Sequence, residues 1–259
     1  MSYIKAENLT KIYGSGDAMV TAVDDISFEI KEGEFIGIMG ESGSGKSTLL
    51  GMMGAMNAPS SGRLIVDDID VYGLRQEQRA DFRREFLGFI FQSFHLVPYL
   101  TVIENVMLPL AVVKANNKKK RSMALEALRQ VGLGEKGHRL PNQISGGESE
   151  RVAIARAIVN EPPVLLADEP TGNLDTKTSR EIMELLLQLN RDGMTIIMVT
   201  HSPDCAAYAR RIMKVSDGKL QEDHPNIRSI ETWQKGEKIK KEPTPGQIQA
   251  LAAGSLRTG

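Results

Sequence analysis

The sequence is nearly devoid of cysteine and has no excess of charge of either sign. Cys205 is the one cysteine among 259 residues. A single cysteine cannot form an internal disulfide, which fits a reducing compartment. Lysine and arginine total 32 against 33 aspartate and glutamate, a formal net charge of −1. Because no global basic field would attract a polyanion, we expect no nucleic-acid partner.

A long hydrophobic run is also missing. The longest stretch without a formal charge, residues 86–103, contains Gln92, His95 and Pro98, so it predicts no membrane span. Lys5 and Glu7 interrupt the apolar character of the first residues, so we expect no signal peptide. These absences predict a cytoplasmic protein. A length of 259 residues with 41% hydrophobic side chains predicts a core that needs neither disulfides nor a structural metal.

The patterns that are present predict an α/β fold. Short apolar runs bounded by turn residues are typical of buried strands, and they cover residues 26–30, 35–39, 86–91, 164–167 and 195–199. The later runs show little alternation, as expected for strands covered on both faces. Apolar residues recur with helical spacing at Ile182, Leu185, Leu186 and Leu189, and Asp175 is placed to cap that helix. Strands that alternate with helices predict a largely parallel sheet.

Two segments depart from this alternation. Residues from about 93 to 160 contain predicted helices around 102–108 and 122–131 and no strand pattern. We interpret them as a helical lobe inserted into an α/β domain of residues 1–222. Residues 223–259 contain three prolines and a lysine-rich stretch, which predicts a flexible tail.

One glycine-rich motif predicts a phosphate-binding loop. Residues 40–48 fit G-x-x-x-x-G-K-[ST] between the predicted strand 35–39 and an apolar helical run. Glycines let backbone N–H groups converge on phosphate oxygens, and a helix N-terminus adds its positive end. Lys46 would bring a charge to the terminal phosphates, and the Ser47 hydroxyl would ligate Mg²⁺. The expected nucleotide-binding residues of this loop are Gly40, Ser42, Gly43, Gly45, Lys46, Ser47 and Thr48.

Two carboxylates follow another predicted strand. Asp168 and Glu169 come directly after the run 164–167, which places them at the carboxyl edge where parallel sheets bind ligands. We expect Asp168 to hold Mg²⁺ directly or through water, and Glu169 to orient or deprotonate an attacking water. By themselves they also fit an acidic helix start after a core strand, but the phosphate loop favours the catalytic interpretation.

A third motif carries a resemblance to a known family. Residues 144–148 are Ile-Ser-Gly-Gly-Glu. Ser145 can cap the helix that follows, and Gly146 and Gly147 let its N-terminus approach an anion. In their order, the three motifs resemble the ATP-binding subunits of ATP-binding-cassette transporters, and the resemblance runs from about residue 4 to 220. That family's signature is usually Leu-Ser-Gly-Gly-Gln, so Glu148 replaces its glutamine.

The resemblance implies a fold and more site residues. The implied fold is a P-loop NTPase core with a mostly parallel sheet, an antiparallel β subdomain and an inserted helical subdomain. Tyr13 matches the residue that stacks on adenine, and Gln92 matches the glutamine that senses Mg²⁺. His201 matches the histidine that contacts the γ-phosphate. Residues 173–175 match the loop that crosses the family's dimer, which adds Asp175 to the nucleotide-binding set.

The resemblance also implies activity and partners. It implies an ATPase that uses ATP and Mg²⁺, with Glu169, His201 and Lys46 as catalytic residues. The implied metal ligands are Ser47, Gln92 and Asp168. Two copies would sandwich two ATP molecules. A separate integral-membrane permease would dock near residues 92–110 and hold the chain at the cytoplasmic face of the plasma membrane.

Finer patterns are similar to the LolD, MacB and FtsE branch of the family, which includes lipoprotein-release and macrolide-export members. They lie at residues 91–96, 101–109 and 168–175. Glu148 occurs in lipoprotein-release members, whereas Ser149 and Glu150 are unusual for the family. A cell-envelope regulator of the FtsE kind, which transports nothing, is the main alternative. A soluble cassette ATPase acting on DNA or ribosomes is a second one, but such proteins usually have tandem cassettes or a long coiled-coil insertion.

Overall fold

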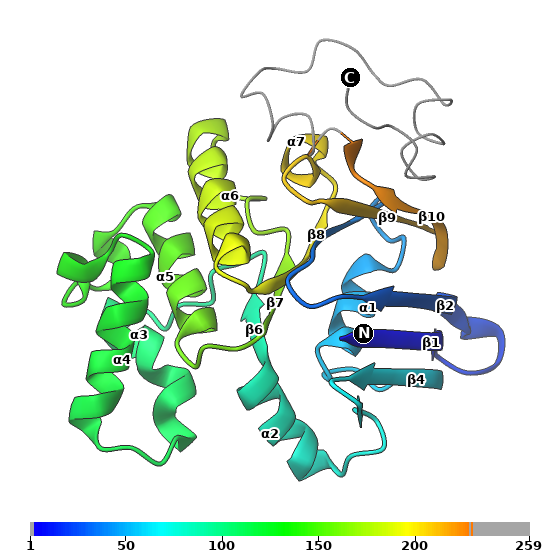
Figure 1. Cartoon of the computed structure of the whole chain (residues 1–259), viewed down its shortest axis with the longest axis horizontal. Coiled ribbons are helices and arrows are strands. Elements are labelled where there is room, and N and C mark those ends of the chain that lie inside the picture. The colour runs from blue at the N-terminus through cyan, green and yellow to red at the C-terminus, as the bar shows by residue number, and fades with distance from the viewer. Residues whose placement is uncertain (1–2, 228, 230–259) are drawn as a thin grey trace, which may run out of the picture.

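The computed structural model describes residues 3–227 and 229, which form two sheets and a set of surrounding helices (Figure 1). The smaller sheet is antiparallel, with strand order β2-β1-β4-β5. Its strands are β1 (Ile4–Tyr13), β2 (Val20–Ile30), β4 (Ser61–Val66) and β5 (Ile69–Asp70). The predicted tail beyond residue 229 lies outside the described residues.

The larger sheet has the order β10-β9-β3-β8-β7-β6 and is parallel except at its β10 edge. Its strands are β3 (Phe35–Met39), β6 (Leu87–Ile90), β7 (Val164–Asp168), β8 (Thr195–Thr200), β9 (Arg211–Ser216) and β10 (Lys219–Pro225). Successive residues of β3 enter different apolar clusters, Phe35 on one face and Ile36 on the other. The sheet is therefore covered on both faces, as the lack of alternation predicts.

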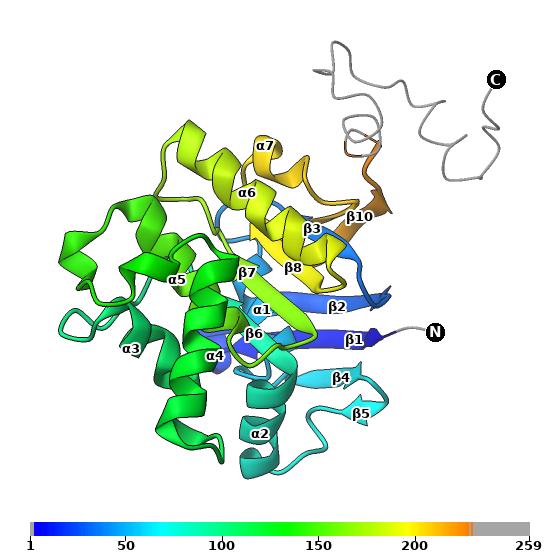
Figure 2. The ribbon, with the colours of Figure 1, turned by 60° about the vertical axis from the view of Figure 1, so that its left-hand side comes forward.

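Helices cover the two faces of this sheet unequally. On one face, α1 (Lys46–Met53) packs in the same apolar cluster as both sheets, with Leu49 and Met52 fully buried. On the other face lie α5 (Gly146–Ile158) and α6 (Thr176–Arg191), and Figure 2 shows α6 in front of β8. The short α7 (Pro203–Ala206) contacts β3 and β8.

The chain between β6 and β7 forms the helices on the left of Figure 1. They are α3 (Val102–Met107), the 3-10 turn η2 (Leu108–Val112), α4 (Asn117–Gln130) and α5, with shorter turns η3 (Gly134–Lys136) and η4 (Pro141–Gln143). The helix predicted around 122–131 starts earlier because the Asn116 side chain accepts a hydrogen bond from Lys119 N–H and caps it. Val102 and Leu128 share one apolar cluster with Phe35 of the large sheet, so the lobe and the sheet share a core.

Several elements differ from the sequence patterns. Phe86 ends α2 (Gln76–Phe86) rather than starting a strand, because the polar residues before it complete a helix. β10 extends to Pro225, beyond the boundary predicted at 222, because His224 and Pro225 pair with Ile212 and Arg211. A further 3-10 turn, η1 (Gly16–Ala18), lies in the β1–β2 connection. Within the described residues, no helix combines the length and apolar character that crossing a bilayer requires.

Candidate nucleotide-binding and hydrolysis site

The predicted phosphate loop connects β3 to α1 at the carboxyl edge of the parallel sheet. Gly43 and Gly45 have φ angles of 80° and 100°, in the left-handed region that side chains disfavour. A Cβ on Gly40 would lie 2.1 Å from the Val215 carbonyl oxygen, and one on Gly45 would lie 2.1 Å from that of Ala22. These backbone contacts explain why glycine is needed at both ends of the loop.

The Lys46 side chain folds back into the loop. It is 7% exposed, and Nζ donates hydrogen bonds to the Glu41 carbonyl oxygen at 2.6 Å and to Ser44 Oγ at 3.4 Å. Lys46 is also the first residue of α1, whose unpaired N–H groups and dipole favour an anion. The loop therefore presents an ammonium group and backbone donors on one side, as binding a polyphosphate requires.

Ser47 and Asp168 meet beside the loop. Ser47 Oγ donates a hydrogen bond to Asp168 Oδ1 at 3.2 Å, joining α1 to the end of β7. Burial raises the pKa of the Asp168 carboxyl, and the nearby Glu169 carboxylate adds to this, whereas Ser47 and Lys46 oppose it. A hydroxyl and a carboxylate in contact suit Mg²⁺, which is usually bound through one or two carboxylates together with substrate phosphates and waters.

Glu169 is fixed by the chain that follows β8. His201 Nδ1 lies 2.7 Å from Glu169 Oε1, and His201 N–H donates to the same oxygen at 3.0 Å. Thr200 Oγ1 donates to the other oxygen, Oε2, at 3.3 Å. The Glu169 side chain is 13% exposed and that of His201 68%, so the histidine forms the solvent side of the pair. Glu169 also has a φ of 48°, a strained backbone for a non-glycine residue.

Gln92 lies next to this pair. A Cβ on Gly172 would be 3.5 Å from Gln92 Nε2 and 3.6 Å from the Glu169 Cβ, which places the amide near the turn that follows Glu169. The backbone carbonyl of Gln92 accepts a hydrogen bond from Asn173 Nδ2 at 2.8 Å. The segment after β6 is therefore tied to the segment after β7.

Tyr13, at the end of β1, is 43% exposed. The Lys11 ammonium lies 5.1 Å from the centroid of its ring, a cation–π contact, and Lys11 Nζ also donates to the Ala58 carbonyl oxygen at 2.6 Å. Lys11 therefore lies over the ring, and the part of the ring that stays exposed is available for a planar base to stack on.

The Ser-Gly-Gly motif starts α5. Ser145 is its N-cap and forms a capping box with Glu148, because each side chain accepts a hydrogen bond from the other residue's N–H. A Cβ on Gly147 would lie 2.3 Å from Thr178 Cγ2, whereas one on Gly146 would have only the Leu174 side chain nearby, at 3.7 Å. The loop packs against the start of α6, and its first helical N–H groups are at the surface.

The predicted cap of α6 is present. Asp175 accepts hydrogen bonds from Lys177 N–H and Thr178 N–H, both at 3.0 Å, and from Thr178 Oγ1 at 2.6 Å. The Thr178 hydrogen bonds, followed by that of Lys177, lower the pKa of the Asp175 carboxyl. In the isolated chain this carboxylate is a helix cap.

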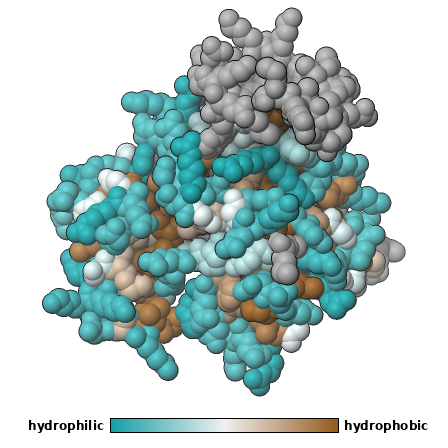
Figure 3. All heavy atoms as spheres, in the orientation of Figure 1, coloured by the Kyte–Doolittle hydropathy of each residue, from teal (hydrophilic) through white to brown (hydrophobic). Residues whose placement is uncertain are grey.

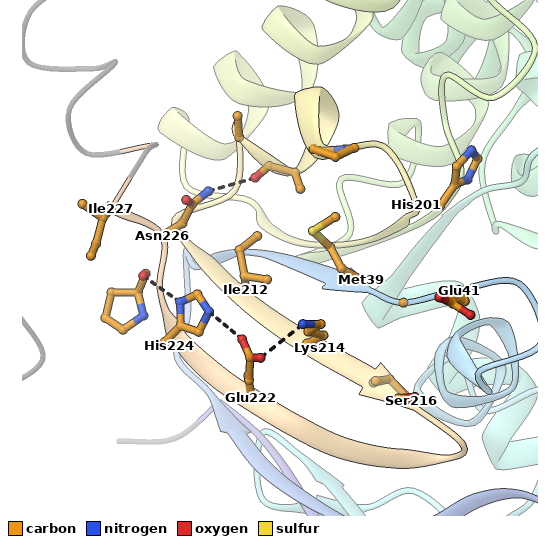
Figure 4. A pocket seen from close by; sticks show the side chains of 16 residues that line it. Met39, Glu41, His201, Ile212, Lys214, Ser216, Glu222, His224, Asn226 and Ile227 are labelled. Carbon is orange, nitrogen blue, oxygen red and sulfur yellow. Dashed lines mark hydrogen bonds and ion pairs between the residues drawn. The ribbon is translucent and has the colours of Figure 1, made fainter. Parts of the chain in front are cut away.

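The phosphate loop and the Ser-Gly-Gly motif border separate hollows. His201 and Gly40 line a groove of about 840 Å³ (Figure 4). Ser145 and Gly147 line another hollow, of about 480 Å³, whose lining includes no residue of the phosphate loop. One chain therefore brings the phosphate loop, Asp168, Glu169 and His201 together, and leaves the signature-like motif elsewhere.

Comparison with known proteins decides the family. The family model described as "ABC transporter" matches residues 23–172, more than half of the chain. The chain belongs to the ABC transporter family. Its fold is that of the family's ATPase cassettes, as the motifs predicted.

Individual relatives cover most of this ABC chain. The lipoprotein-releasing system ATP-binding protein LolD of Bordetella pertussis is 43% identical over 85% of the chain and 96% of its own length. The macrolide export ATP-binding/permease protein MacB of Chlorobaculum tepidum is 44% identical over 85% of the chain but only 34% of its own length. The dimeric, ADP- and phosphate-bound structure of the cassette MJ0796 superposes with a TM-score of 0.79 at 42% identity, covering 86% of the chain and 98% of the solved one.

Sequence reasoning missed two supports of this ABC site. Thr200 donates a hydrogen bond to Glu169, and Lys11 forms a cation–π contact with Tyr13. A hydroxyl at the end of a buried strand, directly before His201, was the available signal for Thr200. In the groove of Figure 4, Glu222 lies between Lys214 at 3.2 Å and His224 at 3.5 Å. No sequence signal marks this groove, because the groove forms where β10 pairs with β9.

Proposed function

We propose that this chain is the ATP-hydrolysing subunit that powers a separate membrane permease. The observation that carries the proposal is the contact between Glu169 and His201 at the strand edge that also holds the phosphate loop. This contact supports a site in which the Glu169 carboxylate, the His201 imidazole and the Lys46 ammonium would surround the terminal phosphate. The roles of the individual residues belong to the same proposal.

Nucleotide binding is the first step. The backbone N–H groups of residues 40–48 and the N-terminus of α1 hold the phosphates. Lys46 exchanges its loop carbonyl partner for phosphate oxygens, and Tyr13 stacks on the adenine through the part of its ring that Lys11 leaves uncovered. Ser47, Asp168 and the Gln92 amide would hold Mg²⁺, which neutralises charge on the phosphates when bound.

Hydrolysis follows when water attacks the γ-phosphorus. Glu169 orients that water and accepts its proton on a carboxylate oxygen, while the bond from the γ-phosphorus to the bridging oxygen breaks and ADP leaves. His201, held by Glu169, positions its ring toward the γ-phosphate and stabilises the charge that develops there.

A second copy of the chain completes each site. Because the signature-like motif lies apart from the phosphate loop of its own chain, residues 145–147 of one copy would bind the nucleotide held by the other. Asp175 and its neighbours lie close to this contact. The isolated monomer should therefore hydrolyse ATP slowly, and ATP should drive dimerisation.

The permease is expected on the helical lobe. Tyr99, Leu108 and Val112 are 80%, 41% and 66% exposed, and Figure 3 shows apolar surface on the lower part of that lobe. They lie on or next to the segment 92–110 that follows Gln92, so a helix docked there would be coupled to the nucleotide site. This partner would place the chain at the cytoplasmic face of the plasma membrane.

The cargo is proposed from the relatives. LolD and MacB, by their names, serve lipoprotein release and macrolide export, and both are similar to this chain over 85% of its length. We infer extraction of a lipoprotein or export of an envelope cargo. An envelope regulator that uses the same ATPase cycle without transport is the second candidate.

Glu169→Gln tests the catalytic assignment. The variant should bind ATP, form a stable dimer in gel filtration and lose at least about 100-fold in kcat, the loss typical when a general base is removed. Asn117→Ala, an exposed change on the helical lobe, is the control and should hydrolyse at the parent rate. Wild-type turnover by Glu169→Gln would refute the role of this carboxylate.

Co-purification tests the transport assignment. A membrane protein encoded beside the gene should be retained with this chain in detergent, and its consistent absence would count against transport.

A further inference from the structure

Glu148 places a carboxylate directly beside the N-terminus of α5. Its Oε2 accepts a hydrogen bond from Ser145 N–H at 2.8 Å, and its own N–H donates to Ser145 Oγ at 3.3 Å. The side chain is 22% exposed and folded back over the first turn. A full negative charge therefore lies within one helical turn of Gly146 and Gly147.

The contacts of this carboxylate favour its charged form. The Lys136 ammonium and, after it, the Ser145 backbone hydrogen bond hold the pKa of Glu148 below its usual value. It is thus ionised at neutral pH. An ionised carboxylate at this position offsets the partial positive charge of the helix N-terminus. It would also repel a phosphate that approaches the same end of the helix.

Lys136 forms an ion pair with Glu148 across two separate elements. Lys136 ends η3, between α4 and α5, and its Nζ contacts Glu148 Oε1. The lysine side chain is 34% exposed, so water and salt screen this pair less than a fully exposed one. The backbone also fixes the lysine, since Lys136 N–H donates to the Leu133 carbonyl and Arg139 N–H donates to the Lys136 carbonyl, both at 3.0 Å.

The hollow around the motif is electrostatically balanced. Its lining includes Lys136, Glu148, Arg151 and Glu181. Arg151 Nη2 lies 3.3 Å from Glu181 Oε2, so the second cation and the second anion are paired as well. Removing Lys136 would leave one net negative charge in this hollow.

We propose that Lys136 is a positioning residue that neutralises Glu148 and thereby makes an acidic signature loop compatible with the terminal phosphate of a nucleotide held by a second copy of the chain. This inference rests on the proposed function, because it requires the ATP-sandwich dimer. It explains how glutamate is tolerated where the family usually has glutamine.

A three-variant charge series in the full-length chain tests the inference. Lys136→Gln leaves Glu148 unpaired and should raise the ATP concentration for half-maximal dimerisation about tenfold. Glu148→Gln keeps the capping box, since glutamine can accept from Ser145 N–H, and should lower that concentration about threefold. The double variant Lys136→Gln/Glu148→Gln should return to within about twofold of the parent.

Two further readouts separate electrostatics from loss of structure. ATP affinity of the monomer, measured with a fluorescent ATP analogue below the dimerisation range, should stay constant across the series because the phosphate loop is untouched. Raising NaCl from 50 to 500 mM should shrink the defect of Lys136→Gln, since salt screens the Glu148 charge, which is partly accessible to solvent. Arg129→Gln breaks an exposed ion pair with Glu126 on the same lobe and should leave dimerisation unchanged.

The outcomes distinguish the two levels of the proposal. If the parent dimerises with ATP but the charge series is flat, or the double variant is as defective as Lys136→Gln, the role of Lys136 is wrong while the sandwich stands. If the parent forms no ATP-dependent dimer, the proposed sandwich fails and this inference fails with it.

Discussion

Asn105 organises the loop that connects the nucleotide site with the helical lobe. Removing its side-chain amide should lower the stability of the fold. It lies in α3 and is fully buried. Its Oδ1 accepts from Val97 N–H at 2.7 Å, and its Nδ2 contacts the carbonyl oxygens of Val97, Leu100 and Thr101 at 3.2, 3.0 and 3.1 Å. One side chain therefore satisfies the backbone of the loop that leads from Gln92 to α3.

The magnitude follows from the groups left unpaired. Asn105→Ala leaves the Val97 N–H without its hydrogen-bond partner, which destabilises the fold by about 1–3 kcal/mol. The small cavity that the substitution leaves adds roughly 1 kcal/mol. The free energy of unfolding should fall by about 3 kcal/mol. For a chain of this size, that lowers Tm by about 6–12 °C.

Differential scanning calorimetry on Asn105→Ala and the exposed control Asn117→Ala measures this loss. ATP affinity of the isolated chain should change by less than about twofold, because Asn105 does not border the phosphate loop. Retention of the permease in detergent should fall, because the loop at 97–101 loses its fixed conformation. A Tm within about 2 °C of the parent would refute the claim that this amide organises the loop.

Three other perturbations have defined outcomes. Gly147→Ala forces Thr178 aside from a 2.3 Å contact, so steady-state ATPase should fall at least about tenfold while monomer ATP binding persists. Burial raises the pKa of Glu150 to about 8 from 4.5, so the folded state retains a proton that the unfolded state loses, and stability falls as pH rises through that window. Glu150→Gln should therefore raise Tm by on the order of 10 °C at pH 8 and by much less at pH 5. Equal Tm shifts at both pH values would show that the effect does not come from the charge of Glu150. Tyr13→Ala should raise the KM for ATP about tenfold with little change in kcat, and an unchanged KM would exclude ring stacking.

Local patterns predicted the parallel core well. Strands such as 35–39 and 164–167 are buried on both faces, so nearly every residue in them is apolar and the signal is strong. The half-exposed strands β1, β4, β9 and β10 were not identified individually. Their charged residues, such as Lys5 and Glu222, are partly exposed, so the apolar signal in these strands is weak.

The sequence alone determined the chemistry of this protein. The chemistry lies in three local motifs, Gly40–Thr48, Ser145–Gly147 and Asp168–Glu169. Each can be recognised from residue types and spacing within a few positions of the chain. The absence of charge excess and of a long apolar run likewise needed only counting. The family could therefore be predicted from the order and spacing of these motifs.

Only the tertiary structure decided which groups meet. The Glu169–His201 pair joins residues 32 positions apart, and Ser47 reaches Asp168 across 121 positions, because parallel strands bring distant carboxyl ends to one edge. The Lys136–Glu148 pair depends on η3 packing beside the start of α5. The single cysteine, from which the sequence predicted only a reducing compartment, proves to be buried, with its Sγ 3.0 Å from Thr171 Oγ1. Such contacts are set by how elements pack, and no local spacing encodes them.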